Sequence, residues 1–155
     1  MEEPGATPEE RLAQMGLELP PPPMPLANYV PFTYAGDLIF TSGVVPIRDR
    51  KVIQGRLGED ISVEDGIGAA QTAALSLLAL LGAAVGRLER VTGLLLLTGY
   101  VRSAPEFARQ SEIIDGASLL LTAVLGDQGR HARVAVGVAE LPRGACVELQ
   151  LTARR

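Results

Sequence analysis

The sequence predicts one α+β domain in which two helices cover one face of a mixed β-sheet. Three observations lead to this fold class: the chain has 155 residues, 47% of them are hydrophobic, and stretches of strand and helix periodicity follow one another. A chain of this length buries one substantial core but not two. Aromatic residues make up only 4% of the chain, so we expect a core of Leu, Val, Ile and Ala.

The first segment, residues 1–24, is expected to form an arm outside the sheet. Thr7, Pro8 and Glu10 give the start of a short helix: a capping residue, a proline at the first helical position and a capping-box glutamate. A proline-rich stretch then favours an extended polyproline strut. The arm would lie on the domain or on a neighbouring subunit, and residues 25–155 would form the domain.

The domain is expected to begin with a β-hairpin and a long helix. Two β-rich runs, residues 29–34 and 38–41, flank a turn that contains glycine, which is typical of a hairpin. A short edge strand is expected at residues 51–53. Apolar residues then recur with helical period from Ser62, the expected capping residue, to Leu88. This pattern predicts a helix that lies across the sheet.

The next strand, residues 91–101, is apolar on both faces because it contains Leu94–Leu97. The chain has little sequence left to cover a second face, so self-association is the simplest way to bury it. A second helix is predicted for residues 105–125. Gly116 lies in its middle, where glycine costs about 1 kcal/mol relative to alanine, and so indicates a close contact.

The last two strands, residues 133–138 and 145–152, are predicted to pair as a closing hairpin. Because side chains alternate between the faces of a strand, we expect their valines and leucines to lie under the helices. Arg133 and Glu148 would then both point away from the core, among small side chains such as Ala135. A partly covered face with one guanidinium and one carboxylate is a candidate pocket between subunits.

These strands resemble the C-terminal signature of the RidA (YjgF) family. The matching residues are Ala132-Arg133, Val138 to Pro142, Gly144 and Val147-Glu148. A second family motif is matched by residues 38–46, and Tyr29 corresponds to a family tyrosine ahead of it. The resemblance covers about residues 25–153. It implies a chorismate-mutase-like two-layer fold that assembles as a homotrimer, with sites between subunits.

The resemblance also implies an activity: hydrolysis of reactive 2-imino acids, such as 2-iminobutanoate or 2-iminopropanoate, to 2-oxo acids and ammonia, with no cofactor and no metal. The residue types suit this chemistry. Arg133 would grip the substrate carboxylate in a bidentate fork. Glu148 would orient a water molecule and transfer a proton. The other expected substrate-binding residues are Tyr29, Ser42, Gly43, Ala135 and Ser111.

Three positions depart from the family pattern. His131 stands where proline is common, and we interpret it as a residue of a solvated turn. Ala135 replaces a reactive cysteine of many members, so thiol chemistry does not carry over, and Cys146 is expected to be a small buried residue. Ser111 replaces an asparagine. These departures bear on the substrate more than on the fold.

Two other functions remain open at the level of sequence. The chain could be a non-catalytic module that binds a small carboxylate at the subunit interface, or an endoribonuclease or translation inhibitor. A net charge of −4 and scattered basic residues argue against a nucleic-acid partner. The longest apolar run, residues 69–85, is too short and too amphipathic for a membrane span, and no signal peptide is evident. We therefore expect a soluble cytoplasmic protein.

Overall fold

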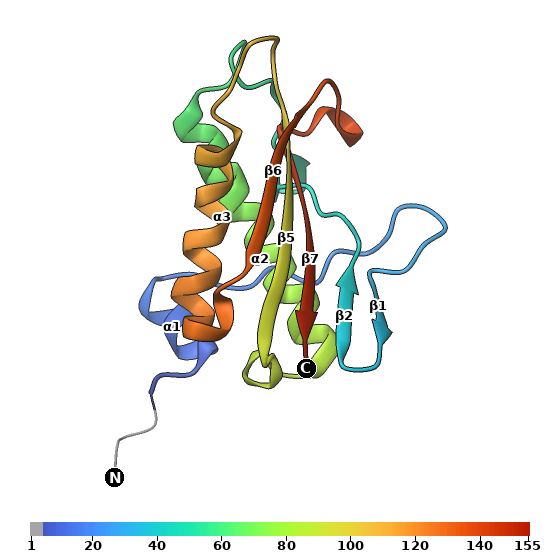
Figure 1. Ribbon diagram of the computed structural model, residues 1–155, viewed down its shortest axis with the longest axis vertical. Helices are drawn as coiled ribbons and strands as arrows, with labels where there is room; N and C mark the ends of the chain where they lie inside the picture. Colours follow the sequence, from blue (N-terminus) through green and yellow to red (C-terminus); the bar gives the residue numbers. More distant parts are fainter. Residues whose placement is uncertain (1–4) are drawn as a thin grey trace.

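The computed structural model describes residues 5–155, so the first four residues of the predicted arm lie outside the described part. One five-stranded sheet carries two long helices on a single face, and the sheet lies in front of α2 in Figure 1. The elements are α1 (Pro8–Gln14), β1 (Phe32–Ala35), β2 (Leu38–Thr41), β3 (Ile47–Arg48), β4 (Lys51–Val52), α2 (Val63–Val85), η1 (Leu88–Arg90), β5 (Gly93–Arg102), α3 (Gln110–Leu125), η2 (Gly126–Gly129), β6 (Ala132–Val138), η3 (Pro142–Gly144) and β7 (Val147–Arg154).

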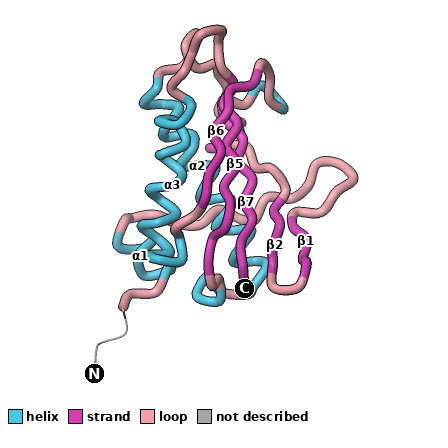
Figure 2. The backbone as a smooth tube through the Cα atoms, in the orientation of Figure 1, coloured by secondary structure: helices cyan, strands magenta, loops and turns pink. Residues whose placement is uncertain are grey.

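The sheet is mixed, as the sequence predicts. Its strand order is β1-β2-β7-β5-β6; β5 runs parallel to β6, and the other neighbours are antiparallel. The short strands β3 and β4 form a separate hairpin. Figure 2 shows β1 and β2 beside β7, at the end of the sheet away from β6. The α+β class and the position of both helices on one face are confirmed.

The predicted start signals of the first two helices are confirmed. Thr7 and Glu10 form the capping box of α1, and the Ser62 hydroxyl accepts a hydrogen bond from the backbone N–H of Asp65 at the start of α2. The arm lies on the domain, since Arg11 Nη1 donates to the Val124 carbonyl of α3 at 3.0 Å and Leu12 is buried. These local signals depend only on neighbouring residues, which explains why they can be read from the sequence.

The prediction of a helix over residues 105–125 is partly wrong. α3 begins at Gln110, five residues later than expected, because Glu106 takes a left-handed backbone conformation with φ of 68° that no helix continues. The close contact expected at Gly116 is confirmed: a Cβ there would collide with the backbone carbonyl of Ile67 in α2. Glycine at this position lets the two helices approach each other.

The prediction that the last two strands pair as a closing hairpin is wrong, because β5 lies between β6 and β7 in the sheet. The face predicted for the valines of β6 is also wrong. Residues that pair across neighbouring strands share a face, and Gly99 of β5 pairs with Ala135 on one side and with Leu149 on the other. Leu149 is fully buried and a Cβ on Gly99 would meet Ile114 of α3, so this row faces the helices. Val134 and Val136 therefore lie on the opposite, open face, where they are 46% and 39% exposed.

The open face of the sheet is notably apolar. Phe40, Leu96, Val134 and Val136 lie on it, each between 38% and 46% exposed. β5, the strand predicted to be apolar on both faces, thus has one face covered within the chain, where Leu94 and Leu97 are buried. Its pairing with β7 shifts in register between Leu94 and Leu96. Large apolar side chains that share one exposed face are typical of an interface between proteins.

One described helix, α2, is long and apolar enough to span a membrane by composition alone. More than half of its apolar stretch (56%) is buried inside the domain. Burial against the sheet and α3 accounts for this hydropathy, as in the core helix of a soluble domain.

Candidate functional site

Arg133 lies on β6, the strand at one edge of the sheet, and its side chain points toward α3. It pairs in register with the buried Leu97, which places its side chain on the helix-covered face. Its guanidinium donates from Nη1 to Asp115 Oδ1 at 2.7 Å, and from Nη2 to Ser111 Oγ at 2.7 Å. The prediction that Arg133 faces away from the helices is therefore wrong. Its ion-pair partner is Asp115.

The donors of Arg133 are almost fully used. Two further hydrogen bonds run from Nη1 to Ser118 Oγ at 3.1 Å and from Nη2 to the Ser111 carbonyl at 3.2 Å. A guanidinium has five N–H groups, so these four bonds leave only the Nε–H without a partner on α3. A carboxylate ligand that takes two N–H groups must therefore displace Asp115 or Ser111.

His131 belongs to the same network. Its Nδ1 lies 2.6 Å from the Gly129 carbonyl, which only accepts hydrogen bonds, so Nδ1 carries a proton. Its Nε2 lies 2.9 Å from Ser118 Oγ and, in the neutral ring, accepts the hydroxyl proton of Ser118. The Ser118 oxygen is then free to accept from Arg133. His131 is half-buried, so the interpretation as a solvated turn residue is wrong.

Asp115 and Ser118 were missed by the sequence reasoning, although a signal was present. Together with Ser111 they are spaced by four and three residues, which places all three on one side of a helix. A polar stripe on an otherwise apolar helix indicates a specific partner on the neighbouring strand. We call Arg133 with Ser111, Asp115, Ser118 and His131 the arginine half-site.

Glu148 lies on the other side of the sheet. It pairs with Tyr100 and alternates with the buried Val147 and Leu149, so it points to the open face, as predicted. Its carboxylate packs directly against Gly43, where an added Cβ would collide with it. Within residues 5–155 no hydrogen bond or ion pair reaches this carboxylate. Burial without a partner raises the pKa of Glu148 above its ordinary value.

Tyr29 and Ser42 lie beside Gly43, around a cavity of about 20 Å³. The Ser42 hydroxyl donates to the Val30 carbonyl at 2.6 Å, and its backbone N–H donates to the Pro31 carbonyl at 2.8 Å. These bonds hold the segment that carries Tyr29 against the end of β2. Tyr29 itself is 51% exposed. We call Glu148 with Tyr29, Ser42 and Gly43 the carboxylate half-site.

One copy of the chain does not bring the two half-sites together. Arg133 and Glu148 lie on opposite faces of the sheet, on strands that β5 separates. Ala135 shares the helix-covered face with Arg133 and packs against the core. Cys146 is fully buried, and desolvation raises the pKa of its thiol to about 11, which leaves it unreactive.

Side chains that could ligate a metal ion are spread over the part of the chain that the structure describes. Residues 5–155 contain no cluster of three or more His, Cys, Asp or Glu side chains placed to hold a metal ion. The charged groups that the described residues bring to the two half-sites are the Arg133 guanidinium and the Asp115 carboxylate in one, and the Glu148 carboxylate in the other.

Comparison with known proteins places this geometry in a family. Residues 9–153 match the family model described as YjgF/chorismate mutase-like, putative endoribonuclease. Protein TCP17 of Trypanosoma cruzi is 41% identical over 140 residues, which is 89% of this chain and 88% of TCP17.

Two crystal structures are similar over nearly the whole chain. Atu1372 from Agrobacterium tumefaciens is 41% identical with a TM-score of 0.88, covering 95% of this chain and 91% of Atu1372. A putative endoribonuclease from Shewanella oneidensis is 34% identical with a TM-score of 0.94, covering 97% of this chain and all of that one. The match to the family model alone thus spans nearly the whole chain.

Proposed function

The chain belongs to the YjgF/chorismate-mutase-like family, and from this premise we propose that it hydrolyses small 2-imino acids to 2-oxo acids and ammonia between copies of itself. One observation carries the proposal: each half-site is chemically incomplete on a single chain. The Asp115 carboxylate beside Arg133 is engaged in an ion pair with it, and Glu148 is a desolvated carboxylate without a hydrogen-bond partner among the described residues. A substrate with a carboxylate and an imine needs both groups.

The apolar open face supports assembly. Its exposed Phe40, Leu96, Val134 and Val136 are covered if copies pack there, and the resemblance noted above implies a homotrimer. The proposal requires that the β6 edge of one copy, which carries Arg133, lies against the Gly43 side of the next. The two half-sites then face one pocket.

The proposed chemistry assigns separate tasks to the two groups. Arg133 binds the substrate carboxylate, using its Nε–H and an N–H that Asp115 or Ser111 releases. Glu148 takes a proton from water as the water oxygen attacks the imine carbon, and passes this proton to the nitrogen, which gives a tetrahedral carbinolamine. It then takes the remaining hydroxyl proton and passes it to the nitrogen as the C–N bond breaks, so that a C=O bond forms and ammonia leaves. Its raised pKa brings it closer to neutral pH, where a general acid–base group works best.

The remaining predicted residues shape the pocket. Ser111 orients Arg133, and Ala135 leaves space beside it. Gly43 lets the Glu148 carboxylate approach the backbone, while Ser42 and Tyr29 border the same region. No cofactor or metal takes part in this proposal, and the expected location is the cytoplasm.

The proposal is tested by ammonia release from freshly generated 2-iminobutanoate. The wild type should exceed the buffer rate, and Arg133→Ala should remove the excess. Arg87→Ala is the matched control, because the Arg87 side chain is 70% exposed and belongs to neither half-site. Equal rates with and without the wild-type protein would exclude this activity for this substrate.

A second candidate is a module that binds a small carboxylate without turnover. The observation that favours it is the ion pair between Arg133 and Asp115, which leaves no free base beside the guanidinium on one chain. Binding of 2-oxobutanoate that depends on Arg133, without ammonia release, would select this function. The nuclease role in the family description would instead require salt-sensitive RNA binding, against a net charge of −4.

A further inference from the structure

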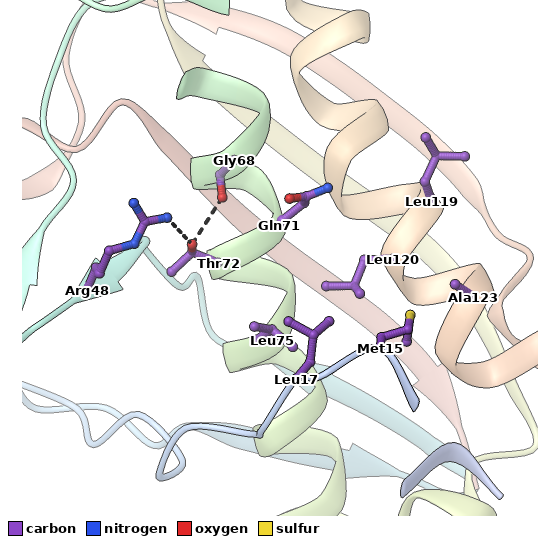
Figure 3. Close-up of a pocket in the computed structure, with 10 residues that line it drawn as sticks. All are labelled: Met15, Leu17, Arg48, Gly68, Gln71, Thr72, Leu75, Leu119, Leu120 and Ala123. Carbon is purple, nitrogen blue, oxygen red and sulfur yellow. Dashed lines mark hydrogen bonds between the residues drawn. The ribbon is translucent and has the colours of Figure 1, made fainter. Parts of the chain in front are cut away.

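A groove of about 620 Å³ opens on the outer side of the helix layer, away from the sheet. Figure 3 shows it between α2 and α3, with the end of α1 below and Arg48 on the opposite side of α2 from α3. Neither half-site contributes a residue to its walls. Its volume lies within the range of roughly 300–1,000 Å³ that is typical of small-molecule sites. We call it the helix-face groove.

The walls of the groove are mostly apolar. Leu75 of α2 and Leu119 and Leu120 of α3 line one part, and Met15 and Leu17 line another. Leu119 is 70% exposed and Met15 is 40% exposed. Large apolar side chains that converge on one hollow while exposed to water favour an apolar occupant.

The arm that forms one wall is held in place by specific contacts. Arg11 donates to the Val124 carbonyl at 3.0 Å, Leu12 is buried, and Glu9 Oε1 accepts from the Leu88 N–H at 3.2 Å. Leu17 packs against the core just beyond α1. The groove is therefore built into the fold and does not depend on a loose segment.

The polar end of the groove is a guanidinium with spare donors. Arg48 Nη2 donates to Thr72 Oγ1 at 3.2 Å, and the Thr72 hydroxyl donates to the Gly68 carbonyl at 3.0 Å. Within residues 5–155 no carboxylate forms an ion pair with Arg48. Arg102 and Arg109 show the contrast, since each has a carboxylate oxygen within 2.9 Å.

We propose that the helix-face groove binds an apolar molecule that ends in one carboxylate, the chemistry of a medium-chain fatty acid. The apolar walls take the hydrocarbon, and the free N–H groups of Arg48 take the carboxylate, which a guanidinium binds in a fork. Thr72 keeps the guanidinium at the mouth without neutralising its charge. This site is independent of the proposed imine hydrolysis.

Calorimetric titration of the full chain with decanoate, below its micelle concentration, tests the proposal. The wild type should bind saturably, and Arg48→Gln should weaken binding about tenfold, as expected for the loss of one charged fork. Arg50→Gln is the matched control on the same hairpin, since Arg50 does not line the groove, and its affinity should stay within about twofold. Decanol, which lacks the charge, should bind more weakly than decanoate.

A second variant tests the apolar end. Leu119 is exposed, so Leu119→Asp should fold normally, yet it should remove decanoate binding. Three results would overturn the proposal: no saturable binding by the wild type, equal affinities of Arg48→Gln and Arg50→Gln, or binding lost in Arg133→Gln instead. The last result would assign the carboxylate to the arginine half-site.

Discussion

Replacing Asp115 with asparagine should strengthen the binding of small carboxylates at Arg133. Asp115 holds one terminal nitrogen of this guanidinium at 2.7 Å, and a ligand carboxylate must compete with it. The Arg133 side chain is 20% exposed and that of Asp115 is 55% exposed, so the pair is partly screened by water. Pairs of this kind contribute about 1 kcal/mol at most. The loss of the competing charge should therefore lower the Kd by up to about fivefold.

Calorimetry with 2-oxobutanoate measures this change without the complication of turnover. Asp127→Asn is the control, because Asp127 is 93% exposed and lies 3.4 Å from Arg130 in a comparable surface pair. Its Kd should match that of the wild type. A weaker affinity of Asp115→Asn would refute the reasoning, because it would mean that Asp115 positions Arg133 for the ligand and does not compete with it.

Two further predictions concern stability. Gly116→Ala should lower the free energy of unfolding by about 1–3 kcal/mol, because the new Cβ meets the Ile67 carbonyl. Gly68→Ala on α2 is the control: its Cβ meets open space, so the free energy of unfolding should rise by up to about 1 kcal/mol. Denaturant unfolding measures both, and equal effects of the two variants would contradict the reasoning. Glu148→Gln should raise Tm at neutral pH. Because the pKa of Glu148 is raised in the folded state, its protonated form stabilises the fold fully below the ordinary glutamate pKa, and this stabilisation is lost as pH rises through the raised pKa. If the Tm of Glu148→Gln depended on pH in the same way as the Tm of the wild type, this explanation would be excluded.

The parts of the fold that follow from local sequence could be predicted. The caps at Thr7 and Ser62 and the close contact at Gly116 depend on neighbouring residues or on one missing side chain. The order of the strands in the sheet could not be predicted, because the alternation of side chains within β6 and β7 does not show that β5 lies between them. The late start of α3 depends on the backbone of Glu106, a residue without a turn preference of its own.

The candidate site was predicted in part, for a related reason. Alternation shows which side chains share a face, but not which face meets the helices. Val134 and Val136 were assigned to the core because they are apolar, and this moved Arg133 to the wrong side. An apolar face that is open to solvent in one chain has the same alternation of side chains as a face that packs in the core. Glu148 was placed correctly because Leu149 and its other neighbours are buried within one chain.

The central claim is that the site consists of two half-sites from different copies, and mixing two inactive variants tests it most directly. Arg133→Ala and Glu148→Gln are unfolded together, refolded at a one-to-one ratio and assayed for ammonia release from 2-iminobutanoate beside the wild type. In randomly mixed rings each pocket takes its halves from two neighbours, so about a quarter of the pockets regain both intact halves. We predict about that fraction of wild-type activity. Activity no higher than that of the separate variants, while native mass spectrometry shows mixed oligomers, would contradict the claim.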